Sequence, residues 1–137
     1  MTLDRRQLRA VTWFYVFGML SQGGLTLLAR LVPAVDRALP AILEETQMIV
    51  PHSLLHIATG LLAVGMLLRG GPDGAWRFLA GFGLFYTALG LLGPLTGLQF
   101  GLGLQHFDHP IHLVLGGAAL AAAWLGRGSR AAGGSRP

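Results

Sequence analysis

Five histidines are the side chains of this sequence best suited to chemistry, and they occur in two short stretches. The first stretch holds His52 and His56, and the second holds His106, His109 and His112. Residues three or four positions apart share one face of a helix, so His52 pairs with His56 and His109 pairs with His112. Neutral imidazole is a common ligand of transition metals and of haem iron. The pattern therefore predicts a metal or haem site if the two stretches meet.

A transition-metal site is one interpretation of this cluster, beside a structural role in packing the bundle. Its predicted ligands are the paired histidines, which are His52, His56, His109 and His112. Asp108 or Glu45 would add a carboxylate oxygen to these nitrogens. Imidazole together with carboxylate suits zinc, nickel, copper or iron, and the sequence does not choose among them.

The same histidines allow three other interpretations. In a b-type haem electron carrier, His56 and His112 would be the axial ligands, and Arg30 or Arg37 would lie near the propionates. In a proton or metal-ion permease, the cluster would form part of a polar path, although the inner half of the bundle offers few ionisable residues to continue it. In a structural role, the neutral rings would join packed helices by hydrogen bonds. These alternatives stay open at the level of sequence.

Transmembrane helices are the elements expected to position the histidines. The chain has 137 residues, of which 53% are hydrophobic and only 12% are charged, a composition outside the usual range of soluble domains. A helix rises ~1.5 Å per residue, so about 20 apolar residues cross the ~30 Å hydrocarbon core. Four such runs predict an all-α transmembrane domain over residues 1–126, with spans at about 11–32, 48–68, 78–98 and 107–125. Residues 127–137 form a basic tail that we expect to be disordered and cytoplasmic.

The arginines predict the orientation of these spans. With both termini in the cytoplasm, the arginines on the inner side are Arg5, Arg6, Arg9, Arg69, Arg77, Arg127, Arg130 and Arg136. Only Arg30 and Arg37 then lie outside, in agreement with the positive-inside rule. The use of arginine in place of lysine, with abundant glycine and alanine, is typical of a GC-rich bacterial genome. We therefore expect a multi-pass protein of the cell inner (plasma) membrane, with the histidines in its outer leaflet.

The second half of the chain resembles a diverged copy of the first. His56–Gly60 aligns with His112–Gly116, and the same alignment pairs His52 with Asp108. The first and third predicted spans contain two more loosely similar segments, Phe14–Gly18 and Phe82–Tyr86. Together these similarities predict a 2+2 internal repeat in which the second and fourth spans are equivalent.

The histidine motifs also carry a resemblance to a known family. The motifs are Pro51–His56 with Gly60, and His109–His112 with Gly116. Two such His-x-x-x-Gly spans, in a chain of this length with four predicted helices, resemble an uncharacterised bacterial family of four-helix membrane proteins, a domain of unknown function. The resemblance covers the whole chain loosely. It implies a fold and a topology, and it brings no activity and no catalytic residues.

Other classes of function find few residues in this chain. Cysteine is absent, which excludes thiolate ligands and disulfides, and the arginines form no basic stripe of the kind that binds nucleic acid. No catalytic residues are predicted, because Ser53 and His52 are neighbours that point about 100° apart on a helix. Tyr15 and Tyr86 are interpreted as anchors near the inner membrane interface. The sequence thus predicts a small non-enzymatic protein whose partner is the lipid bilayer, with an accessory role beside other membrane subunits as one candidate.

Overall fold

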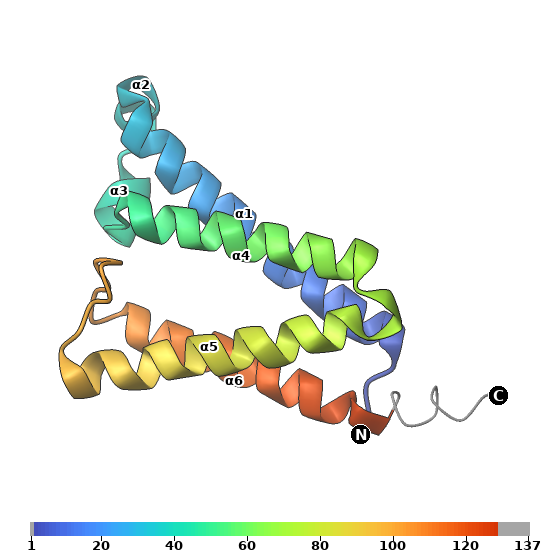
Figure 1. The fold of residues 1–137 in the computed structure, drawn as a ribbon. Helices are drawn as coiled ribbons and strands as arrows, with labels where there is room; N and C mark the ends of the chain where they lie inside the picture. The colour runs from blue at the N-terminus through green and yellow to red at the C-terminus, as the bar shows by residue number, and fades with distance from the viewer. Residues whose placement is uncertain (1, 129–137) are drawn as a thin grey trace.

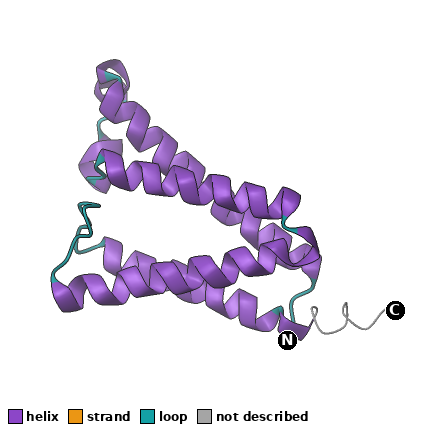
Figure 2. Ribbon diagram, viewed as in Figure 1, coloured by secondary structure: helices purple, strands orange, loops and turns teal. Residues whose placement is uncertain are grey.

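Helices make up every regular element of this protein in the part of the chain that is described. The structure is a computed structural model, and it describes residues 2–128 (Figure 2). The all-α prediction is therefore confirmed over this range. Most of the predicted basic tail, residues 129–137, lies outside the described residues.

Four long helices follow one another along the chain, with shorter ones in two of the connections. The long helices are α1 (Arg5–Leu31), α4 (Val50–Arg69), α5 (Gly74–Thr96) and α6 (Asp108–Leu125). The short elements are α2 (Pro33–Ala38), α3 (Ala41–Thr46) and the 3-10 turn η1 (Gly71–Asp73). The connection between the first two predicted spans, residues 33–47, is thus largely helical. Pro33 and Pro40 lie at the starts of α2 and α3. The first backbone N–H groups of a helix have no partner within it, so proline, which lacks this group, loses no helical hydrogen bond there.

The long helices differ from the predicted spans mainly at their ends. Helix α1 begins at Arg5 rather than near residue 11, because Asp4 and Gln7 form a capping box before the apolar run. The Asp4 carboxylate accepts a hydrogen bond from the Gln7 backbone N–H at 2.8 Å, and the Gln7 side chain accepts one from the Asp4 N–H at 2.9 Å. Helix α5 continues past Pro94 to Thr96 and is capped by Gly97, whose φ of 66° lies in the left-handed region that favours glycine.

The long helices form two antiparallel pairs. Helix α1 packs mainly against α4, and α5 packs mainly against α6. Figure 1 shows the chain passing back and forth through these four helices, with the start of α1 and the end of α6 at the same end as the turn between α4 and α5. The first turns of α4 and α6 therefore lie at the opposite end. These are the turns that carry His52 and Asp108.

Three of the described helices are long and apolar enough to cross a membrane. They are Arg5–Leu31, Val50–Arg69 and Gly71–Thr96. Their outward faces carry large apolar side chains such as Phe17, Leu68 and Leu95, which are 75%, 69% and 79% exposed. Such surfaces are stable only against lipid or another apolar partner. Helix α6 is not among these three, and the polar residues Asp108, His109 and His112 in its first half lower its mean hydropathy.

Glycines let the two helices of each pair approach closely. A Cβ atom on Gly23 of α1 would lie 2.7 Å from the Ser53 carbonyl oxygen and 2.8 Å from the His56 Cβ on α4. A Cβ atom on Gly116 of α6 would lie 2.6 Å from the backbone nitrogen of Thr87 on α5. Neither helix pair could keep this separation with a larger residue at these positions. The same close contacts fix the rotation of α4 and α6, and hence the direction of their histidines.

Candidate metal site

Three of the five histidines converge between the two helix pairs. His52 and His56 come from successive turns of α4, and His112 comes from α6. One potential ligand nitrogen from each ring lies within 4.8 Å of the others. The three side chains are only 2%, 4% and 3% exposed. We call His52, His56 and His112 the histidine triad.

The nitrogens of the triad are not used for packing by hydrogen bonds. Both ring nitrogens of His52, both of His56 and Nδ1 of His112 are buried without a hydrogen-bond partner among the described residues. Buried polar atoms are nearly always paired, because each unpaired one costs about 1–3 kcal/mol. Five such atoms in one cluster make this place a candidate site for a polar or cationic ligand. A cluster of this kind could bind a metal ion.

The triad surrounds a small cavity. Its volume is about 30 Å³, and its lining is formed by Met19, Gln22, His52, His56, Tyr86, Phe107, Asp108, Ile111, His112 and Leu115. A space of this size holds about one water molecule or one metal ion. Pockets for larger ligands measure roughly 300–1,000 Å³. The size of the cavity therefore favours a single ion over a haem between His56 and His112. The haem assignment stays a prediction.

Aromatic side chains close the inner side of the triad. The Tyr86 ring contacts the His112 ring edge-on at 5.1 Å between centroids, and it stacks on Phe82 at 4.2 Å. Phe82 in turn packs on Tyr15 at 4.6 Å. The Tyr86 hydroxyl donates a hydrogen bond to the Met19 sulfur at 3.6 Å. This arrangement places a wall of aromatic side chains between the triad and the end of the bundle where α1 begins and α6 ends.

Sequence reasoning missed the contact between Tyr86 and the triad. Tyr86 is 1% exposed and lies in the core, so it is not an anchor at the membrane interface. Its position near the middle of the predicted span 78–98 was the available signal, because interface anchors lie at span ends. Tyr15 is also buried, and its hydroxyl donates a hydrogen bond to the Leu115 carbonyl oxygen at 2.8 Å.

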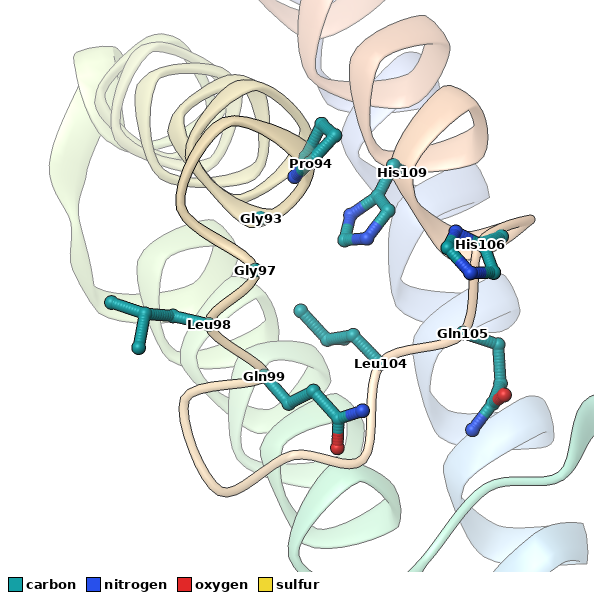
Figure 3. A pocket seen from close by; sticks show the side chains of 9 residues that line it. All are labelled: Gly93, Pro94, Gly97, Leu98, Gln99, Leu104, Gln105, His106 and His109. Carbon is teal, nitrogen blue, oxygen red and sulfur yellow. The ribbon is translucent and has the colours of Figure 1, made fainter.

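The structure leaves His109 and His106 apart from the triad. Figure 3 shows His109 beside Gly93 of α5, and a Cβ atom on Gly93 would lie 2.6 Å from the His109 Nδ1. His109 and His106 line a separate cavity of about 170 Å³ under the loop between α5 and α6. One of the four histidines predicted as metal ligands therefore points to α5 instead of joining the other three.

The remaining predicted contributors lie in different places. Asp108 is 7% exposed and lines the cavity of the triad, while Glu45 is exposed on α3 and is not part of that lining. The Arg30 side chain donates a hydrogen bond from Nε to the Met48 carbonyl oxygen at 2.8 Å, so it ties the end of α1 to the start of α4. Arg37 lies on α2 outside the cavity lining. Asp108 is thus the one predicted carboxylate that joins the site.

No protein-family model matches the chain, and no curated protein or solved structure matches it. The resemblance to a four-helix membrane family accordingly stays a prediction. The fold and the site by themselves define a class: an all-helical protein with three helices able to cross a membrane and a buried histidine cluster able to bind a metal.

Proposed function

We propose that this protein is a four-span membrane protein that binds one divalent transition-metal ion through His52, His56 and His112. The observation that carries the proposal is the convergence of these buried imidazoles within 4.8 Å, with five of their six ring nitrogens buried and without a partner among the described residues. Ligand nitrogens around a tetrahedral zinc ion lie about 3.3–3.4 Å apart, given Zn–N bonds of ~2.0–2.1 Å. The three rings must therefore turn toward one another for their nitrogens to bind the same ion.

Metal binding accounts for the site better than helix packing does. Histidines that only join helices would donate or accept hydrogen bonds across the helix interface. The Thr26 and Ser53 hydroxyls, two polar groups on α1 and α4, are hydrogen-bonded to each other at 2.8 Å. The triad nitrogens are left for a ligand. A resident ion would satisfy them and hold α4 to α6.

Binding is also favoured over permeation. A permease needs polar groups that continue from its central site to both membrane faces. On the side of the triad toward the turn between α4 and α5, four large side chains fill the bundle interior and contact one another. They are Tyr15, Met19, Phe82 and Tyr86. The cavity lining includes Phe107 and Asp108 near the start of α6, so an ion would enter and leave from that end. We therefore assign the site a binding role.

Helix α6 is proposed as the fourth span. It has 18 residues, about 27 Å at ~1.5 Å per residue, which nearly matches the hydrocarbon thickness. It lies against α5, and Val114 and Trp124 on its outer face are 69% and 63% exposed. Its polar residues Asp108 and His112 are buried toward the bundle. This division matches a span that faces lipid on one side.

The arginine distribution supports an orientation with both termini in the cytoplasm and the triad in the outer leaflet. The chain has no cysteine, so single cysteines can report the side of the membrane. We expect Ala41→Cys, on α3, to react with a membrane-impermeant maleimide in intact cells. Thr2→Cys should react only after the cells are opened. Reaction of Thr2→Cys in intact cells, with Ala41→Cys protected, would reverse the orientation.

The contacts between helices support the 2+2 repeat. A Cβ atom added to Gly23 would lie 2.7 Å from the Ser53 carbonyl oxygen. A Cβ atom added to Gly90 would lie 2.8 Å from the His109 carbonyl oxygen. Gly23 and Gly90 are separated in the sequence by the same number of residues as Tyr15 and Phe82. Ser53 and His109 are separated by the same number of residues as His56 and His112. One alignment of the two halves therefore matches the members of each pair. Equivalent residues thus make equivalent contacts in the two helix pairs.

This alignment is shifted by one residue from the one in the sequence analysis, which matched Phe14 with Phe82. Under it, Tyr15 is equivalent to Phe82 and Met19 to Tyr86, and each of these pairs is in contact, at 4.6 Å between rings and 3.6 Å between hydroxyl and sulfur. Equivalent residues that touch each other mark a pseudo-two-fold axis between the helix pairs. The triad lies beside this axis. A site shared by two related halves is expected at such an axis.

Metal content of the purified protein tests the proposed function. Protein purified in detergent, incubated with Zn²⁺ and passed through a desalting column is expected to retain about one zinc per chain by elemental analysis. The control is a variant with His52, His56 and His112 all changed to alanine, which should retain none. Equal zinc in the two proteins, or none in the natural one with Zn²⁺, Co²⁺, Ni²⁺ or Cu²⁺, would overturn the proposal.

A further inference from the structure

Asp108 is the one acidic side chain that lines the cavity of the triad. It stands in the first turn of α6, one turn before His112, and it is 7% exposed. One carboxylate oxygen, Oδ2, accepts a hydrogen bond from the Gln105 backbone N–H at 2.7 Å, which fixes the group. A carboxylate has about four acceptor sites, so this bond leaves others for a metal.

The charge of Asp108 has no cationic partner in the cavity. No arginine or lysine is among the residues that line it. A buried carboxylate without a counter-ion is costly, and so is a divalent cation held only by neutral imidazoles in a bundle interior. Each group offsets the cost of the other when they meet. The ligand nitrogens of the three histidines converge within 4.8 Å, and the Asp108 carboxylate lines the same cavity without belonging to that converging group. Three imidazoles with one carboxylate are a donor set that suits a divalent cation.

The internal repeat points to the same residue independently. Under the repeat, His56 is equivalent to His112, and His52 is equivalent to Asp108. Both members of the first pair and one member of the second belong to the triad. The fourth position of a symmetric ligand set is then the position that Asp108 occupies.

Resting on the proposed metal site, we infer that Asp108 is the fourth ligand, and that the ion sits in a closed His₃Asp centre beside the pseudo-two-fold axis. Four protein ligands leave no open position for water or substrate, which is typical of a structural or storage site rather than a catalytic one. The ligand class is a divalent cation of borderline softness that accepts nitrogen and oxygen together, such as Zn²⁺ or Co²⁺. The repeat also predicts that histidine is an acceptable replacement for Asp108.

Cobalt is the probe for this inference, because the visible spectrum of Co²⁺ reports its coordination. The purified protein should bind Co²⁺ with the intense absorption of a four-coordinate ion, and added azide should not change the spectrum. Asp108→Asn keeps an oxygen for the Gln105 N–H but loses the charge. This variant should bind Co²⁺ at least ~100-fold more weakly, at or beyond the ~10–100-fold effect of residues that only orient a ligand. Its spectrum should respond to azide.

Two further variants complete the test. Asp108→His should regain most of the affinity and resist azide, and His109→Ala, next to Asp108 but outside the triad, should match the natural protein. Azide sensitivity in the natural protein, or an Asp108→Asn variant with unchanged affinity and spectrum, would overturn the fourth-ligand assignment while leaving the metal site intact. Failure of the natural protein to bind any of the metals would instead remove the proposed function itself.

Discussion

Replacing His56 with alanine is expected to weaken metal binding by about 100-fold. Structural zinc sites have apparent binding free energies of about 10–16 kcal/mol, so one of four ligands contributes on the order of 3 kcal/mol, or ~100-fold in affinity. His112→Ala should lower the affinity by a similar factor, because the proposed repeat would make these two residues equivalent. The measurement is competition for Zn²⁺ with a chromophoric chelator in detergent.

Thermal unfolding gives a second readout of the same change. A ligand present at 100 times its dissociation constant stabilises a protein by about 2.7 kcal/mol, so Zn²⁺ should raise the melting temperature of the natural protein. It should leave the melting temperatures of His56→Ala and His112→Ala unchanged. His109→Ala is the matched control and should respond to Zn²⁺ normally. A large loss in one of the two triad variants and none in the other would contradict their equivalence.

Changing Gly116 to alanine is expected to destabilise the protein by about 2–3 kcal/mol, the upper part of the range for overpacked cores. The added Cβ would lie 2.6 Å from the Thr87 backbone nitrogen and 3.0 Å from the Gly83 carbonyl oxygen. Both are backbone atoms that cannot rotate away, so α6 must move from α5. Since α6 carries His112, the affinity for Zn²⁺ should fall as well.

Gly117 provides the control for this substitution. It is the next residue of the same helix, and a Cβ atom there would meet nothing within 4 Å. Gly117→Ala should therefore be neutral or slightly stabilising, as alanine is a better helix former than glycine by up to ~1 kcal/mol. The two melting temperatures can be compared by tryptophan fluorescence in detergent. If Gly116→Ala unfolds at the same temperature as Gly117→Ala, the close contact of α5 with α6 does not limit stability.

Much of the fold was predictable because its causes are local. Apolar runs of about 20 residues become helices wherever backbone groups must bond within the segment, and the predicted spans agree with the long helices to within a few residues at most ends. The start of α1 is the main exception. There the capping box of Asp4 and Gln7 extends the helix through three arginines that a count of apolar residues leaves out.

The candidate site was predictable only in part. Spacing alone places His52 and His56 on one face of α4, since a helix repeats every 3.6 residues. The same rule placed His109 and His112 on one face of α6, yet only His112 reaches the triad. Residues three apart differ by about 60° in direction, and that angle is enough for His109 to face Gly93 on α5 while His112 faces the other helix pair.

The sequence by itself determined the helices, their order and the two histidine stretches. Only the tertiary structure decided which histidines meet, that Tyr86 and Phe82 close the site from within, and that Asp108 lines it while Glu45 does not. The physical reason is that helix formation depends on neighbours in the chain, whereas the rotation of each helix depends on contacts between chain-distant glycines and their partners, such as Gly23 with Ser53 and Gly116 with Thr87.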